Sequence, residues 1–279
     1  MRPPAPRPVA RHPFCEHPGP LAVAHRGFSL TGRENTLAAF AAAVELGFTH
    51  LETDVRATAD GRLVAFHDER LDRVSDVSGQ LAALPWSVVR TARVGSSSGG
   101  PGEPVPLLED ALGSFPGARF NVDVKTPAAL AGLGGVLRRT GAHGRVLLTS
   151  FSERRRVAAL AAAGRGADGS RPATSASLVR TAAALAGLRS PGAVRAAVVR
   201  AALGGVDAVQ VPVRHRGVAV VSEALVDAVH RAGVQVHVWT VDEAVQMHAL
   251  LDLGVDGLIT DRADVLRGVL RARGQWVPG

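Results

Sequence analysis

Carboxylates at alternating positions mark two apolar stretches of the chain. Glu52 and Asp54 lie in the run LETDV, and Asp123 lies in the run NVDVK, which ends on Lys125. Because side chains alternate between the two faces of a β-strand, the polar residues of each run share one face. Charged groups on a buried face need an ion partner or a metal ion. Glu52, Asp54 and Asp123 therefore predict a site for a divalent cation that prefers oxygen ligands, Mg²⁺ or Ca²⁺.

A third run, QVHVW over residues 235–239, repeats the alternation of polar and aliphatic side chains. One such run alone is more typical of an antiparallel strand with one face in water. Three runs with the same pattern favour strands whose aliphatic face is covered by helices and whose polar face points into a barrel. Polar residues near the carboxyl ends of such strands are where barrel enzymes place their active sites.

Two histidines follow strand-like stretches. His25-Arg26-Gly27 comes directly after LAVA, and His67 with Asp68 comes directly after GRLVAF. Imidazole can transfer a proton near neutral pH, and a guanidinium group can bind two phosphate oxygens at once. The first motif therefore suits phosphate recognition, whereas a lone histidine such as His67 is more often structural. The other eight histidines have no comparable context.

The basic residues are almost all arginine. Of 32 Lys+Arg residues, Lys125 is the single lysine. It lies on the polar face of its predicted strand, two residues after Asp123. Chance is the alternative explanation, since one lysine must stand somewhere. Its position favours a function, because a compact ammonium group can approach a phosphate oxygen beside a cation where a planar guanidinium does not fit.

Short apolar runs alternate with helix-like stretches along most of the chain. The alternation predicts parallel strands joined by helices, and the count favours a closed (β/α)8 TIM barrel, an α/β fold. Ser152 is expected to cap a helix that runs to Ala163, and Thr240 with Glu243 has capping-box spacing. Residues 56–103 are too long for a simple connection, so we expect an inserted segment after the second strand. The eight predicted strands span residues 21–25, 50–55, 120–125, 145–151, 173–177, 208–211, 234–239 and 257–260.

Composition narrows the class of protein. Seven of the 17 prolines fall in the first 20 residues, which predicts an arm over 1–20 followed by one domain over 21–279. A single cysteine excludes an intramolecular disulfide and any cysteine-rich metal site. The N-terminus lacks the apolar core of a secretory signal, and no run approaches the roughly 18 apolar residues of a membrane span. We therefore expect a cytoplasmic enzyme with no integral membrane segment.

The net charge of +7 raises the question of nucleic-acid binding. The arginines are scattered over predicted helices, and aromatic residues make up only 4% of the chain. This pattern is typical of solvated helix faces rather than of a nucleic-acid interface. A positive field would instead attract small anionic substrates. We expect no nucleic-acid partner.

Several motifs in order resemble the glycerophosphodiester phosphodiesterase family. They span about residues 21–270 and are AHRGFSLTGRENTLAAFAAAVELGF, LETDVRATADGRLVAFHDERLDRVSD, VPLLEDAL, NVDVK, HVWTVDE and GVDGLITDRADVL. The resemblance implies a TIM barrel of the phospholipase C-like phosphodiesterase type. It also implies metal-dependent hydrolysis of glycerophosphodiesters to glycerol 3-phosphate and an alcohol.

The resemblance also implies roles for single residues. Asn35 lies in the family's Glu-Asn-Thr motif, as a structural support or a helix cap. Asp123 is one methylene shorter than the family's usual glutamate, although some relatives carry aspartate there. Asp242 and Ala263 stand where asparagine and proline are frequent, and we expect little effect from either. By the same resemblance, His25 and His67 are the acid/base pair, Glu52, Asp54 and Asp123 the metal ligands, Arg26 and Lys125 the phosphate contacts, and Trp239 the aromatic residue at the mouth of the site.

The resemblance leaves alternatives open. The nucleophile is water or the substrate's own neighbouring hydroxyl, and either histidine can be the acid. A phospholipase D-like enzyme on lysophospholipid or sphingomyelin could use the same residues but needs an apolar entrance. Residues 84–105 could form a lid there, although they offer little apolar surface beyond LPW at 84–86. A non-catalytic nucleic-acid or phosphate binder and a metal-free phosphosugar isomerase leave the carboxylates unexplained.

Overall fold

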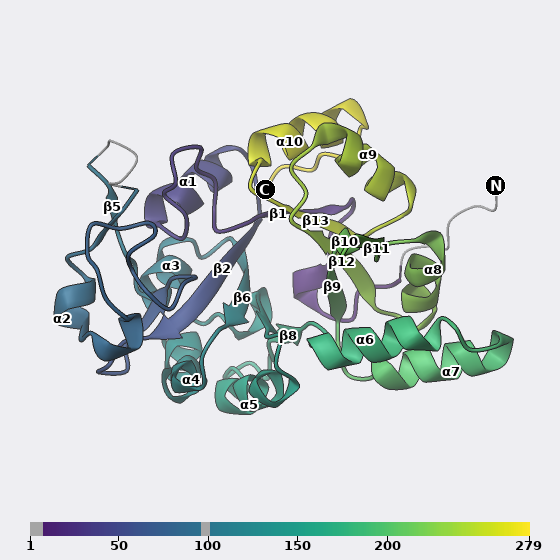
Figure 1. Cartoon of the computed structure of the whole chain (residues 1–279), viewed down its shortest axis with the longest axis horizontal. Helices are drawn as coiled ribbons and strands as arrows, with labels where there is room; N and C mark the ends of the chain where they lie inside the picture. Colours follow the sequence, from purple (N-terminus) through teal and green to yellow (C-terminus); the bar gives the residue numbers. More distant parts are fainter. Residues whose placement is uncertain (1–7, 96–100) are drawn as a thin grey trace.

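The structure, a computed structural model, describes residues 8–95 and 101–279. Eight parallel strands form a barrel (Figure 1), which confirms the (β/α)8 prediction. The ring order is β1, β2, β6, β7, β8, β9, β12 and β13, and β13 pairs again with β1. These strands are β1 (Leu21–Ala24), β2 (His50–Ala57), β6 (Arg119–Val124), β7 (Val146–Thr149), β8 (Ala173–Thr174), β9 (Ala208–Pro212), β12 (Gln235–Trp239) and β13 (Gly257–Thr260).

The seam between β8 and β9 closes the ring with few contacts. One parallel bridge joins Ser175 to Ala208. Two backbone hydrogen bonds flank it, from Ala176 N to Ala208 O at 2.8 Å and from Asp207 N to Thr174 O at 2.8 Å. The neighbouring pair β9 and β12 is in register over five residues. The barrel is therefore nearly closed, and its weakest join lies between β8 and β9.

Helices follow the strands and cover their outer faces. Thr36, Ser152 and Ser222 cap their helices by accepting a backbone N–H three residues ahead, as side-chain oxygens at that position typically do. The predicted capping box at Thr240 is wrong, because Glu243 is the N-cap and makes no side-chain bond. The helices are α1 (Leu37–Glu45), α3 (Leu108–Ser114), α4 (Leu130–Arg139), α5 (Glu153–Ala163), α6 (Leu178–Gly187), α7 (Gly192–Ala202), α8 (Glu223–Arg231), α9 (Ala244–Asp252) and α10 (Ala263–Ala272), with short 3-10 turns at Leu81–Ala83, Pro127–Ala129 and His143–Arg145.

The predicted insertion after the second strand is confirmed. It contains β3 (Leu63–Ala65), which runs antiparallel to β2, then α2 (Trp86–Val89), β4 (Arg93–Val94) and β5 (Glu103–Pro104). The segment has its own buried cluster, separate from the barrel core, which includes Phe66, Leu71 and Val89. In Figure 1 it lies on the opposite side of the barrel from α6 and α7. Residues 96–100 of the proposed lid lie outside the described residues.

The strands keep the alternation of the sequence. Val122 and Val124 are fully buried in the core that the strands share with the helices, while Asn121 and Asp123 line a pocket. This arrangement confirms that the aliphatic face points outward and the polar face inward. A small hairpin of β10 (Arg214–His215) and β11 (Val218–Ala219) follows β9. In the described part of the chain, no helix has the length and apolar character needed to cross a membrane.

Residues of the predicted N-terminal arm pack against the amino-terminal end of the barrel. A 3-10 turn at Pro13–Cys15 buries Phe14 and Cys15 against Leu147 and neighbouring strand residues. Gln235 Nε2 donates to Cys15 O at 3.0 Å, and His50 Nε2 bonds Phe14 O at 2.9 Å. Residues 1–7 of the arm lie outside the described residues.

His50 makes the stability of this end dependent on pH. The side chain is fully buried, and burial lowers the pKa of His50 to about 3. The unfolded chain therefore binds a proton near pH 6.5 that the folded protein excludes, so stability is complete above that pH and falls below it. Between pH 7.5 and 5.5 we expect His50 to remove about 1.4 kcal/mol. Urea unfolding at both pH values should show a smaller loss in His50→Gln, and an equal loss would contradict this.

Candidate active site

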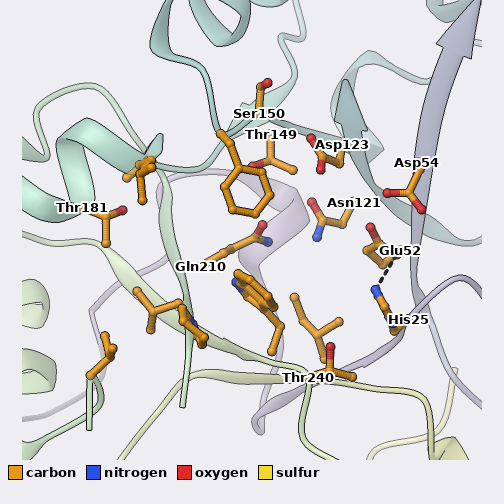
Figure 2. Close-up of a pocket in the computed structure, with 18 of the residues that line it drawn as sticks. His25, Glu52, Asp54, Asn121, Asp123, Thr149, Ser150, Thr181, Gln210 and Thr240 are labelled. Carbon is orange, nitrogen blue, oxygen red and sulfur yellow. Dashed lines mark ion pairs between the residues drawn. The ribbon is translucent and has the colours of Figure 1, made fainter. Parts of the chain in front are cut away.

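A pocket of about 590 Å³ opens where the barrel strands end. His25 follows β1, Lys125 follows β6 and Thr240 follows β12. The pocket therefore lies at the carboxyl ends of the strands, where barrel enzymes have their active sites. Figure 2 shows Glu52 and Asp123 facing the same space as His25.

Four polar side chains from two neighbouring strands line one side of this pocket. Glu52 and Asp54 come from β2, and Asn121 and Asp123 come from β6. The parallel register places Glu52 beside Asn121 and Asp54 beside Asp123. All four are between 1% and 6% exposed. The pattern of the two runs thus places three carboxylates and an amide together away from water.

Lys125 lies between two of these carboxylates. Its Nζ is 2.9 Å from Asp54 Oδ1 and 2.7 Å from Asp123 Oδ2. Burial lowers the pKa of Lys125, but the charges of Asp54 and Asp123 outweigh burial and raise the pKa above its ordinary value. The ammonium therefore stays charged and neutralises the acidic side of the pocket.

The two aspartates respond differently to this environment. Burial raises the pKa of Asp123 above its ordinary value, and Lys125 offsets only part of that effect. Burial also acts on Asp54, but the charges of Lys125 and Arg26 bring the pKa of Asp54 below its ordinary value. Asp54 is consequently the better stabilised anion of the pair.

The loop after β1 holds Asp54 from its other side. Asn35 Nδ2 donates to Asp54 Oδ2 at 2.9 Å, and Asn35 Oδ1 accepts from Thr53 Oγ1 at 2.6 Å. Arg26 Nε is 3.3 Å from Asp54 Oδ2. Arg26 and Asn35 have φ angles of +56° and +57°, which few non-glycine residues adopt. Asn35 is thus a support for Asp54, whereas the helix cap is Thr36.

Glu52 faces His25 and the backbone of the same loop. Its Oε2 accepts from Arg26 N at 3.1 Å and lies 3.8 Å from His25 Nε2. Burial and the neighbouring charge of Asp54 raise the pKa of Glu52 above its ordinary value. Burial lowers the pKa of His25, but the charge of Glu52 and the hydrogen bond to Asp261 outweigh it and raise the pKa.

Each of the two predicted catalytic histidines, His25 and His67, has an aspartate on Nδ1. His25 Nδ1 is 2.7 Å from Asp261 Oδ1, and His67 Nδ1 is 2.6 Å from Asp68 Oδ1. Asp242 Oδ1 accepts from Asp261 N at 2.9 Å and so fixes the loop that carries Asp261. An Nδ1–H donated to a carboxylate leaves Nε2 free to accept or donate a proton. Both side chains are therefore set up for proton transfer in the pocket.

The three carboxylates do not form a ready-made cation site in the residues that the structure describes. The ammonium of Lys125 stands between Asp54 and Asp123 instead. The donor set nevertheless fits an oxygen-liganded cation. Asp123 Oδ1 and Asn121 Oδ1 are buried and have no hydrogen-bond partner among the described residues, and buried oxygens of that kind need a partner.

The opposite side of the pocket is apolar. In Figure 2, Thr181 lies across the space from Asp54 and Asn121. Phe151 and Trp239 pack edge to face with ring centroids 5.9 Å apart. Helix α6 and the strand ends next to it supply most of the other residues on this side, which include Leu178, Ala182, Leu185, Val211, Pro212 and Val220.

The structure brings every predicted site residue into this one pocket. His25, Arg26, Glu52, Asp54, His67, Asp123, Lys125 and Trp239 all line it. Sequence reasoning did not identify Asp261 or Asp68 as the partners of the histidines, although both stand in the quoted motifs next to strand ends. The apolar side of the pocket comes from α6 and the loops near it, and none of the described residues of the possible lid at 84–105 lines the pocket.

Comparisons with known proteins agree with this arrangement. A family model described as the glycerophosphoryl diester phosphodiesterase family matches residues 25–265. A curated protein of Mycobacterium tuberculosis, named "probable glycerophosphodiester phosphodiesterase 2", is 46% identical over 264 residues, which cover 94% of this chain and 95% of that protein.

Solved structures share the fold. A glycerophosphodiester phosphodiesterase from Agrobacterium tumefaciens superposes with a TM-score of 0.71 at 24% identity, covering 90% of this chain and 98% of that one. A phosphodiesterase of Oleispira antarctica, solved with the product sn-glycerol 3-phosphate, has a TM-score of 0.71 at 22% identity, covering 91% of this chain and 97% of that one.

Proposed function

The chain is an enzyme of the glycerophosphoryl diester phosphodiesterase family, and from this premise we propose how its own residues work. It hydrolyses glycerophosphodiesters to glycerol 3-phosphate and an alcohol. Glu52, Asp54 and Asp123 hold a divalent cation, Mg²⁺ or Ca²⁺, and His25 with His67 moves the protons. The observation that carries this proposal is that two aspartate-bound histidines open into the same pocket as three carboxylates.

Neutralising the substrate's charge is the first requirement of the reaction. A phosphodiester is an anion and repels a nucleophile. Arg26 and Lys125 both line the pocket and both carry stable positive charge, so they can bind the phosphate oxygens and stabilise the charge that grows in the transition state. A divalent cation, when bound by the three carboxylates, would polarise the phosphoryl group further.

Proton transfer is the second requirement. One histidine accepts a proton at Nε2 from the attacking water or from the substrate's neighbouring hydroxyl. The other donates a proton from Nε2 to the leaving alkoxide. Asp261 and Asp68 stabilise the imidazolium that forms on each ring and keep the rings oriented. The product found in the Oleispira antarctica structure is the one expected from this chemistry.

Both histidines should be needed for turnover of glycerophosphocholine. His25→Ala and His67→Ala should each lower kcat by about 10² or more, because general acid–base catalysis contributes at least that much. Release of glycerol 3-phosphate measures the reaction. His248→Ala, on helix α9 and outside the pocket lining, is the matched control and should keep full activity. Near-normal kcat in both pocket variants would reject the assignment.

The same assay tests the cation. Exhaustive chelation should abolish activity, and added Mg²⁺ or Ca²⁺ should restore it. Without a divalent cation, Lys125 stays paired with Asp54 and Asp123, and the carboxylates repel the phosphate of the substrate. Undiminished activity in the chelated enzyme would remove the metal from the proposal while leaving the histidines in place.

Lys125→Arg should be damaging although it conserves charge. A planar guanidinium is larger and does not fit between carboxylates that both lie within 3 Å of the ammonium nitrogen. Loss of one charge-assisted contact is worth about 1.5–3 kcal/mol, which lowers kcat/KM by roughly tenfold or more. Arg139→Lys, the converse change in the exposed ion pair with Glu109, is the control. Wild-type kcat/KM in Lys125→Arg would make the lysine coincidental.

A lipid substrate is the second candidate for the same site, and the apolar side of the pocket favours it. A glycerophosphodiester with a small head group needs only the charged side. Phe151, Leu178 and Leu185 extend the pocket on the other side, and each methylene buried there would contribute about 0.8 kcal/mol to binding. We propose that this side takes the acyl chain of a lysophospholipid.

Leu178 allows this to be tested on the folded enzyme. Its side chain is 59% exposed and lines the pocket, and the adjacent Val179, 61% exposed, does not line it. Leu178→Ser should lower kcat/KM for a short-chain lysophosphatidylcholine by about fivefold, equivalent to about 1 kcal/mol of apolar contact. Glycerophosphocholine should be unaffected, as should both substrates in Val179→Ser. No turnover of lysophosphatidylcholine would eliminate the lipid candidate.

A further inference from the structure

A chain of ion pairs runs behind the pocket from one end of the site to the other. Arg26 Nη1 donates to Glu34 Oε1 at 2.8 Å. Arg73 donates to both oxygens of Glu34, from Nη2 to Oε1 at 2.6 Å and from Nη1 to Oε2 at 3.1 Å. Arg73 Nε donates to Asp68 Oδ2, and Asp68 Oδ1 bonds His67 Nδ1. This series of ion pairs thus links Arg26 to His67.

Only the two residues at the ends of this series of ion pairs line the pocket. Arg26 and His67 line it, whereas Glu34, Asp68 and Arg73 do not. Glu34 belongs to the loop between β1 and α1, and Arg73 belongs to the inserted segment after β3. These ion pairs therefore hold the insertion, which supplies His67, against the barrel loop that supplies Arg26.

Arg73 is suited to this place by the shape of its side chain. The two Nη groups bind one carboxylate while Nε binds another. An ammonium group is a point charge and does not reproduce that planar fork.

The contacts of Arg73 also change the pKa values of its two carboxylate partners. Burial raises the pKa of Glu34 and of Asp68, but the hydrogen bonds from Arg73 outweigh burial and bring both pKa values below their ordinary range.

Folding stability alone does not explain the arrangement. The Arg73 side chain is 49% exposed, and exposed ion pairs contribute little to stability. Placement of reacting groups is far more sensitive, because a shift of about 1 Å can lower a rate by 10²-fold. Among the described side chains, the Asp68 carboxylate bonds His67 and Arg73. Without Arg73, no second side chain would hold that carboxylate against His67.

We propose that Arg73 and Glu34 are positioning residues of this enzyme. Arg73 fixes the Asp68 carboxylate against His67, and Glu34 orients both Arg73 and the phosphate-binding Arg26. The inference rests on the proposed function, since it gives His67 and Arg26 their roles. It adds that Arg73, which also belongs to the inserted segment, completes the site without itself lining the pocket.

The steady-state constants of single variants separate the two roles. Arg73→Ala leaves the bond between Glu34 and Arg26 in place, so kcat for glycerophosphocholine should fall on the order of tenfold while KM stays within about twofold. Glu34→Gln weakens both connections, so kcat should fall similarly and KM should rise as well. In the variant that combines Arg73→Ala with Glu34→Gln, kcat should match that of Glu34→Gln alone rather than fall by the product of both effects.

Arg139→Ala is the matched control. Arg139 also binds both oxygens of a glutamate, Glu109, at 2.7 Å for each bond, but away from the pocket. Arg139→Ala and Arg73→Ala should have similar melting temperatures, and only the latter should lose kcat. Equal, wild-type kcat in the two variants overturns the proposal.

Arg73→Lys serves if Arg73→Ala does not fold. It keeps the charge but not the fork, so kcat should stay well below wild type, and wild-type kcat overturns the proposal. The proposed function fails separately: in that case His67→Ala itself retains full activity. An inactive His67→Ala beside a fully active Arg73→Ala rejects only the positioning role.

Discussion

Burial of like charges inside the barrel is the constraint on which the site depends. Glu52, Asp54 and Asp123 come from adjacent strands and are almost inaccessible to water, where unpaired anions are strongly unfavourable. The ammonium of Lys125 lies between Asp54 and Asp123, and the loop after β1 contacts Glu52 and Asp54. Before any substrate binds, the site is thus already balanced by the same cations that are proposed to meet the phosphate.

Much of the fold could be predicted because the barrel repeats one local rule. Alternation in LETDV and NVDVK predicted which side chains of these two runs point into the barrel, since a strand allows only two faces. The helix that Ser152 was predicted to cap does begin at Glu153, directly after it. Thr240 was misassigned because the residues after it bond the end of β13 and the helix begins only after Glu243: Val241 N donates to Ile259 O, and Asp242 Oδ1 accepts from Asp261 N. Local spacing resembles a cap but does not reveal that tertiary path.

The site was predictable in its first contacts and not in those behind them. Motif residues reach the pocket because strand ends converge there. Asp261 meets His25 across 236 residues of chain, and Arg73 meets Glu34 across 39, so neither partner follows from spacing. The apolar side was missed for a similar reason: α6 reaches the pocket only because β8 and β9 close the ring, and nothing in its sequence marks it as a wall.

The left-handed backbone at Arg26 and Asn35 sets a limit on how this enzyme could be made more robust. Glycine would relax both positions, since it adopts such φ angles without strain, yet each of these side chains contacts Asp54. Stabilising substitutions in this loop would therefore compete with activity, as is common where strain and function coincide. A search for thermostable variants should find them elsewhere, and this loop should stay unchanged in every variant that keeps its turnover.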